Sequence, residues 1–407
     1  MSLLDCITNG NREGNLTDDQ ARLASDLYIG LEVEYQGSMN RGAAQARAAR
    51  ETFDSLKKLA SEKKRKKLLQ VQAFKQVDKN LREYRGFGDK ENYAKAAEAL
   101  IEQDVFSKFS SLVQRQQAIE QRATSKMYDV LATFKRNLVG SIRNKAKLKN
   151  MVREVFGEDT GDLSAKEFSS AWKAASEDLR LQFNRAGGSI PKRSDWGLPQ
   201  SHDQIAVGKV RKNEWVMFTM SRLDPEKMID HETGLKMTED RLMFALQDVW
   251  ETISSGGLNK VKPGAMASNR KALANSRTDH RFLVFKDAES YMAYQAKFGD
   301  EDVISTIYQH LESISRDTAM MRALGPNPNS GFRYLKDLIR INTKDLDLKP
   351  QDKIRSKIEG LENLYLAHSG RLNSGADKMW ANGLAGLRHM LTSAVIGSAT
   401  LLAQSDF

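Results

Sequence analysis

Histidines and carboxylates that stand next to one another could carry out proton transfer. His202 precedes Asp203 in a segment that also contains Trp and Pro residues, so its imidazole could act as a base oriented by the carboxylate. Side chains of adjacent residues usually point apart, however, and no nucleophile near this pair stands in a recognisable setting. We therefore predict that the pair packs within the fold, and we assign no catalytic residue.

Three other groups of residues could bind a metal ion. His231-Glu232 resembles the start of a zinc-protease motif, but Leu235 stands where the second His would be. The acids of residues 158–162 lack the alternating ligands and the twelfth-position Glu of a calcium loop. A looser set comprises Asp279, His280, His310, Glu312 and Asp317. None of these patterns is complete, so we predict no metal and no cofactor.

The clearest indication of a ligand is basic. Five consecutive cations, Lys63-Lys64-Arg65-Lys66-Lys67, cover more than one turn of a predicted helix. A second basic cluster comprises Arg143, Lys145, Lys147 and Lys149. The net charge is about −5 for residues 1–40, about +14 for residues 41–150 and about +1 for the remainder. Such a region would bind DNA phosphates without reading sequence, while a solvated helical stretch and a nuclear address are the alternatives for the first run.

Composition indicates a helix-rich protein. The chain has 407 residues, of which 40% are hydrophobic and 29% charged, with only seven prolines, and this length allows two or three domains. Cys6 is the single cysteine, so the fold has no internal disulfide. The first residues lack a secretory pattern. The longest apolar segment, residues 390–403, is shorter than the roughly 20 residues that a membrane span needs.

Apolar spacing predicts a mainly α fold that begins with a long basic helical hairpin. Thr17 and Gln20 form a capping-box pattern that starts a helix reaching about Gln36. Residues 43–83 lack Pro and Gly and repeat apolar side chains at three- and four-residue steps, which predicts a helix of about 40 residues. Gly86 and Gly88 end it, and a second long helix is predicted over residues 93–135.

A mostly helical module with a minor β element is predicted to follow. Its helices are expected at residues 165–183, 288–298 and 302–324, and short strands at residues 215–218 and 281–285. Residues 385–403 are rich in small side chains and predict a buried or interface helix, or one that inserts into an envelope. The expected divisions are an N-terminal helical segment (1–40), a basic hairpin (41–150), the mixed module (151–330) and a C-terminal helical region (331–407).

Three blocks in the second half of the chain resemble a known family. They are Trp196-Gly197-Leu198-Pro199-Gln200-Ser201-His202-Asp203, then Asp279-His280-Arg281-Phe282-Leu283-Val284-Phe285-Lys286-Asp287-Ala288, and then Leu324-Gly325-Pro326-Asn327-Pro328. In this order and spacing they are similar to the large internal virion proteins of tailed phages and prophages. The resemblance covers roughly residues 145–405.

This resemblance implies a structural, non-enzymatic protein that is packaged in the virion interior and assists DNA delivery across the host envelope. Its implied partners are phage DNA, the portal, other internal virion proteins, further copies of itself and the host membrane. Two other classes remain open at this point. One is a peptidoglycan-cleaving virion enzyme, and the other is a nucleic-acid-binding protein that is not part of the virion.

Overall fold

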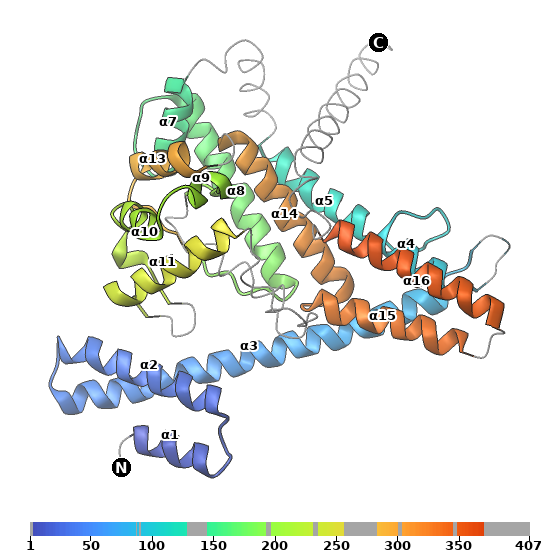
Figure 1. Cartoon of the computed structure of the whole chain (residues 1–407), viewed down its shortest axis with the longest axis horizontal. Coiled ribbons are helices and arrows are strands. Elements are labelled where there is room, and N and C mark those ends of the chain that lie inside the picture. The colour runs from blue at the N-terminus through green and yellow to red at the C-terminus, as the bar shows by residue number, and fades with distance from the viewer. Residues whose placement is uncertain are drawn as a thin grey trace. The chain divides into compact units, whose positions relative to one another are not determined.

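A computed structural model describes residues 3–86, 88, 91–127, 145–192, 197–230, 235–255, 283–299, 303–344 and 348–369. These residues form fourteen α-helices and one 3-10 helix, which confirms the predicted mainly α class (Figure 1). The chain divides into two compact units. Unit 1 comprises Met1–Asn80 and Leu112–Leu335, and unit 2 comprises Leu81–Ser111 and Lys336–Phe407. The four divisions expected from the sequence stay a prediction.

Two helices run from one unit into the other, namely α3 (Arg41–Glu83) and α15 (Pro328–Thr343). The other helices of unit 1 are α1 (Leu3–Arg12), α2 (Asp18–Gln36), α5 (Leu112–Ser125), α7 (Lys145–Val155), α8 (Leu163–Arg185), α9 (Gln204–Gly208), α10 (Lys212–Met220), the 3-10 helix η1 (Pro225–Lys227), α11 (Glu239–Ser254), α13 (Ala288–Phe298) and α14 (Val303–Leu324). Unit 2 contains α4 (Tyr93–Ile101) and α16 (Leu348–His368), which pack together.

Short polar side chains start many of these helices. The Thr17 hydroxyl accepts from the backbone N–H of Gln20, and the Gln20 side chain accepts from the N–H of Thr17, which confirms the predicted capping box. Single caps of the same kind are Asn92, Asp162, Asp203, Thr238 and Asp287. The helix starts are therefore specified locally.

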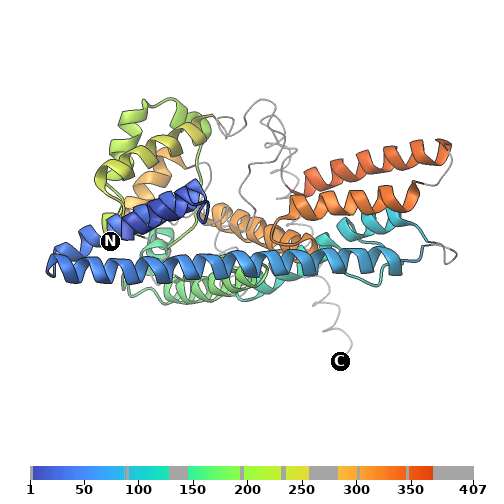
Figure 2. The same ribbon diagram turned by 90° about the horizontal axis from the view of Figure 1, so that it is seen from below.

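The predicted first long helix is confirmed as α3, an unbroken helix of 43 residues (Figure 2). A four-residue connection, 37–40, joins it to α2, as expected for antiparallel neighbours. Tyr28 and Leu31 of α2 pack against Ala48 of α3 in a buried cluster. Gln45 donates to the Glu32 carboxylate at 2.9 Å. The first part of α3 thus pairs with the helix before it.

The predicted second long helix, residues 93–135, is wrong. The chain leaves the helical conformation after Ile101 and resumes it at Leu112, so α4 and α5 are separate. Asp104 accepts from the backbone N–H of Phe106 at 2.9 Å, and the Ser107 hydroxyl bonds the backbone of Phe109. Such side chains offer the backbone an alternative to helical bonds, and they break the helix without Pro or Gly. The hairpin expected between residues 43–83 and 93–135 therefore does not form as predicted.

Helices α5, α8 and α14 pack side by side and form the main core of unit 1 (Figure 1). Trp172 and Phe168 of α8, Ile119 of α5, and Ile307 and Ile314 of α14 are buried there. Each large apolar side chain of this kind contributes roughly 1.5–3 kcal/mol on burial. The predicted helices at 165–183 and 302–324 are both confirmed.

An aromatic cluster joins α10 and α13. Trp215 lies edge-on to Tyr294 and Phe298, with ring centroids 6.2 Å and 6.4 Å away. The strand predicted at residues 215–218 is wrong, because these residues form part of α10. Trp215, Val216 and Thr219 are buried on one helical face, so packing overrides the β preference of this short run.

Of the strand predicted at residues 281–285, only 283–285 are described. Phe285 forms an isolated antiparallel bridge with Leu223, and a second bridge joins Ile229 and Lys236. The β element within the described residues is therefore limited to single bridges. No helix in these ranges is long and apolar enough to cross a membrane. The apolar helix predicted at residues 385–403 lies outside them.

Two turns of unit 1 touch each other at a glycine. Gly187, after the end of α8, has φ of 117°, and a Cβ atom there would lie 2.5 Å from Cγ of Pro326. Pro326 belongs to the turn between α14 and α15. Both the backbone conformation and the contact require a residue without a side chain.

We expect Gly187→Ala to lower the free energy of unfolding by about 3 kcal/mol, since it adds a clash to backbone strain. Gly157→Ala is the matched control. Gly157 has φ of 94° and open space around it, so strain alone should cost about 1–2 kcal/mol. Urea denaturation followed by circular dichroism measures both. Equal losses would show that the contact with Pro326 does not matter.

Candidate nucleic-acid interface

The predicted run of five cations lies in the middle of α3, and its side chains fall into two groups. Lys63, Lys64 and Lys67 are exposed, whereas Arg65 and Lys66 are partly buried. Successive residues of a helix differ in direction by about 100°. The run therefore cannot face a single ligand, and each group needs its own explanation.

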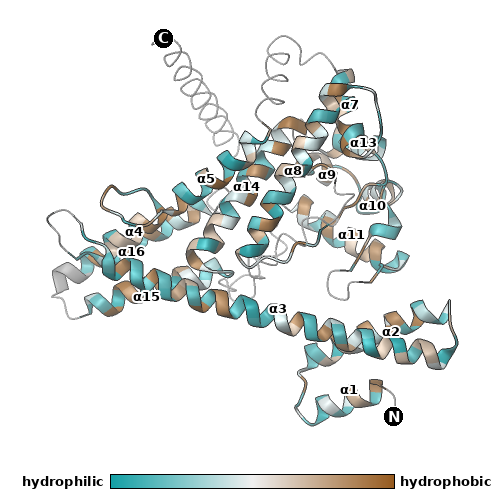
Figure 3. Ribbon diagram, turned by 180° about the vertical axis from the view of Figure 1, so that it is seen from behind, coloured by the Kyte–Doolittle hydropathy of each residue, from teal (hydrophilic) through white to brown (hydrophobic). Residues whose placement is uncertain are grey.

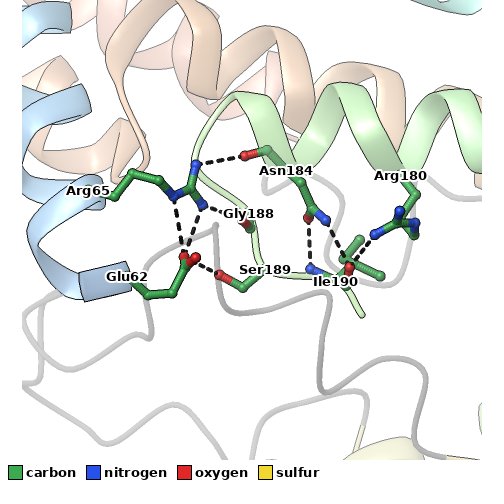
Figure 4. Close-up of polar contacts among 7 residues, drawn as sticks. All are labelled: Glu62, Arg65, Arg180, Asn184, Gly188, Ser189 and Ile190. Atoms are coloured by element: carbon green, nitrogen blue, oxygen red, sulfur yellow. Dashed lines mark hydrogen bonds and ion pairs between the residues drawn. The ribbon is translucent and has the colours of Figure 1, made fainter. Parts of the chain in front are cut away.

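Arg65 makes hydrogen bonds that connect α3 to the end of α8 (Figure 4). Its guanidinium donates to the Glu62 carboxylate, with Nη2 3.0 Å from Oε2, and to the backbone carbonyl oxygens of Asn184 at 3.0 Å and Gly188 at 2.8 Å. These carbonyls belong to the last turn of α8 and the loop after it. The carbonyls of a helix end lack intrahelical partners and carry partial negative charge, so Arg65 caps α8.

The loop after α8 is held from both sides (Figure 4). From α3, the Glu62 carboxylate accepts from the Ser189 hydroxyl at 3.2 Å. From α8, the Asn184 side chain donates to the carbonyl of Ile190 at 2.8 Å and accepts from its N–H at 2.7 Å. Arg180 donates to the same carbonyl at 2.8 Å. Arg65 is therefore part of a polar network that fixes this loop.

The neighbouring turn of α3 holds a second helix end. The Gln70 side chain donates to the carbonyl of Leu324 at 2.8 Å and accepts from the N–H of Asn327 at 2.8 Å. Phe74 stacks on Tyr334 of α15 with ring centroids 4.5 Å apart. Burial lowers the pKa of Lys66. This side of α3 thus serves packing, and little of it remains for a ligand.

The opposite side of α3 carries a lysine row, which we define as Lys57, Lys64, Lys67 and Lys75. All four are exposed. Their directions on an ideal helix agree within about 80°, and the row is about 27 Å long. Hydrophilic residues colour most of α3 in Figure 3. Lys57 and Lys75 were not predicted as site residues because they lie outside the consecutive run; the helical period could have indicated them.

Apolar side chains lie between the lysines. Phe53, Leu68 and Val71 are 66%, 56% and 50% exposed, and they fall on the same side of α3 as the lysine row. The α3 surface is therefore basic and partly apolar. It suits a polyanion that offers phosphates together with the less polar surface of sugars and bases.

The second predicted cluster is only partly described. Lys147 and Lys149 are exposed on α7. Two positions on a helix differ in direction by about 200°, so these side chains point to opposite sides. Arg143 and the side chain of Lys145 lie outside the described residues. The described members do not share one face.

The residues considered for proton transfer contact different groups. His202 places Nδ1 2.9 Å from the hydroxyl of Tyr294, whose pKa is raised by burial. The Asp203 carboxylate instead accepts from the N–H groups of Ile205 and Ala206 and caps α9. The structure therefore does not pair His202 with Asp203 as a base and its orienting acid.

The acids considered as calcium ligands have structural contacts. Asp162 caps α8, and its bond from the Ser164 hydroxyl lowers the pKa of the carboxyl group. Asp159 pairs with Lys166 at 2.8 Å. Among the described residues, no three His, Cys, Asp or Glu side chains are arranged to hold a metal. His231, Glu232, Asp279 and His280 lie outside those residues.

Comparison with models of known families, with curated proteins and with solved structures gave no match. The interpretation of the α3 surface therefore depends on the residues of this chain. The geometry of this surface allows multipoint contact with a long anion.

The difference between the partly buried Arg65 and the exposed Lys64 can be tested by measuring stability. Arg65→Ala removes the cap of α8 and the guanidinium that contacts the Glu62 carboxylate, so we expect a loss of about 2 kcal/mol in the free energy of unfolding. Lys64→Ala, one residue earlier and exposed, should change it by less than about 0.5 kcal/mol. Urea denaturation of the two variants would contradict this division if the losses were equal.

Proposed function

We propose that this protein is a structural, nucleic-acid-binding component of a tailed-phage virion, packaged beside the genome and delivered with it. The observation that carries the proposal is the lysine row on α3, a helix of 43 residues. The three sequence blocks that resemble internal virion proteins support the phage class. Neither feature implies catalysis, and the proposed role is structural.

Electrostatics explains how the α3 surface would bind. Duplex DNA carries one negative charge per about 1.7 Å of axis, so a row about 27 Å long can meet several phosphates at once. Lysine ammonium groups on flexible stems adapt to phosphates without fixed geometry. Binding of this kind ignores base sequence and releases counterions, so it weakens steeply with salt.

The proposal places the protein in the virion interior before infection and in the host envelope afterwards. Its partners would be phage DNA, the portal, other internal virion proteins, further copies of the chain and the host membrane. The exposed Phe53, Leu68 and Val71 support such contacts, because apolar side chains grouped on one helix face are commonly covered in an assembly.

The lysine row can be tested by its effect on salt dependence. The slope of log affinity against log salt is negative. We expect replacement of Lys57, Lys64, Lys67 and Lys75 by Gln to make it less steep by about 3–4, because each lost phosphate contact removes about 0.9 from its magnitude. Fluorescence anisotropy with labelled random-sequence duplex DNA measures the slope.

The matched control removes four exposed lysines elsewhere: Lys173, Lys209, Lys353 and Lys357. This control lowers the net charge by the same amount but leaves the lysine row intact. We therefore expect it to change the slope by less than 1. If both variants lost the same amount, net charge alone would explain binding and the α3 surface would have no special role.

Virion location is tested separately by mass spectrometry of purified particles before and after DNA release. We expect the protein in full particles and its loss from emptied ones. Absence from both would overturn the virion part of the proposal and favour a nucleic-acid-binding protein that acts in the infected cell.

A further inference from the structure

A second group of cations gathers where α5, α8 and α14 pack together. It comprises Arg115 and Arg122 of α5, Lys126 directly after α5, Arg185 of α8 and Arg322 of α14, and we call it the arginine cluster. None of these residues belongs to the basic runs of the sequence. They come together because the three helices are neighbours.

One carboxylate lies among these cations. Asp178 of α8 is 3.1 Å from Nε of Arg122 and 3.5 Å from Nζ of Lys126. Gln182 donates to the same carboxylate at 2.9 Å and accepts from Arg322 at 3.1 Å. This chain of contacts links all three helices. Asp178 is mostly buried, and Arg122 and Arg185 are exposed. Arg322 is exposed to solvent on one side and enclosed by protein on the other.

The cluster has an excess of positive charge. Arg122 and Lys126 contact the Asp178 carboxylate, Arg322 contacts the neighbouring Gln182, and Arg185 lies on the same face of α8 as Asp178 and Gln182. The cations outnumber this carboxylate, and their repulsion contributes to the lowered pKa of two of them. Burial lowers the pKa of Arg322, and the charges of Arg185 and Arg122 lower it further. Burial and the charge of Arg322 lower the pKa of Arg115 in the same way. An anion that bound here would relieve this repulsion.

We propose that the arginine cluster is a phosphate-binding site that forms a second contact with nucleic acid, on helices other than α3. That the phosphates belong to nucleic acid rests on the function proposed above; the preference for phosphate rests on the cluster itself. Guanidinium groups bind phosphate oxygens through paired N–H donors, and several of them on a rigid three-helix core are pre-organised for this.

The nucleic-acid contact is tested with Arg185→Gln/Arg322→Gln. We expect the slope of log affinity against log salt for duplex DNA to become less steep by about 2, since each lost contact removes about 0.9 from its magnitude. The control, Lys173→Gln/Lys209→Gln, removes two exposed charges from unit 1 and should leave the slope within 0.5 of the unchanged protein. A wild-type slope in the arginine variant would overturn the proposal.

Inorganic tripolyphosphate tests the site without DNA. At constant ionic strength it should raise the melting temperature of the full chain, and Arg185→Gln/Arg322→Gln should lose most of this shift while the lysine-row variant keeps it. No shift in the wild-type protein would overturn the phosphate site. A retained shift without any DNA binding would instead overturn the proposed function and leave an anion site.

A conservative variant guards against misfolding. Arg185→Lys/Arg322→Lys keeps both charges, so the DNA slope should stay near the wild-type value. The paired donors are lost, so affinity for tripolyphosphate should fall several-fold. If tripolyphosphate bound this variant as tightly as the wild-type protein, the cluster would act by net charge alone and the proposed phosphate geometry would be wrong.

Discussion

The middle of α3 satisfies the polar ends of two other helices, and unit 1 depends on this constraint. The last carbonyls of a helix have no partners within it, and leaving them unpaired where helices pack is costly. Arg65 meets this need for α8, and Gln70 meets it for the turn after α14. Because α8 and α14 also form the main core of unit 1 with α5, these contacts connect α3 to that core.

The same contacts determine which way α3 faces. With Arg65 and Gln70 held against the ends of α8 and α14, α3 cannot turn about its own axis without breaking several hydrogen bonds at once. The lysine row lies on the other side, so the backbone positions of its members face outward while their flexible side chains can still adapt. A structural interaction thus decides which cations of one basic run can reach a ligand.

What could be predicted from the sequence was what depends on near neighbours in the chain. Thr17 and Gln20 are three residues apart, so the start of α2 was recognisable, and the long stretch without Pro or Gly indicated α3. The break after Ile101 was not recognisable, because Asp104 and Ser107 end helices only when their side chains turn to the backbone. The structural contacts of Arg65 were not recognisable either, because its partners lie 119 and 123 residues away in the sequence.

Cations that are adjacent in the sequence need not be adjacent in the structure, and the reverse also holds. Lys63 to Lys67 are consecutive, yet their side chains point in different directions around the helix. Arg122 and Arg322 are distant in sequence, yet Asp178 and Gln182 link them in space. A basic run therefore marks a helix that can carry a binding surface, and the fold selects the residues that form it. Lysines on a single helix suit loose contact with a long polyanion, and arginines set between three packed helices suit closer contact with individual phosphates. The two surfaces would therefore divide non-specific attraction and precise phosphate contact between them.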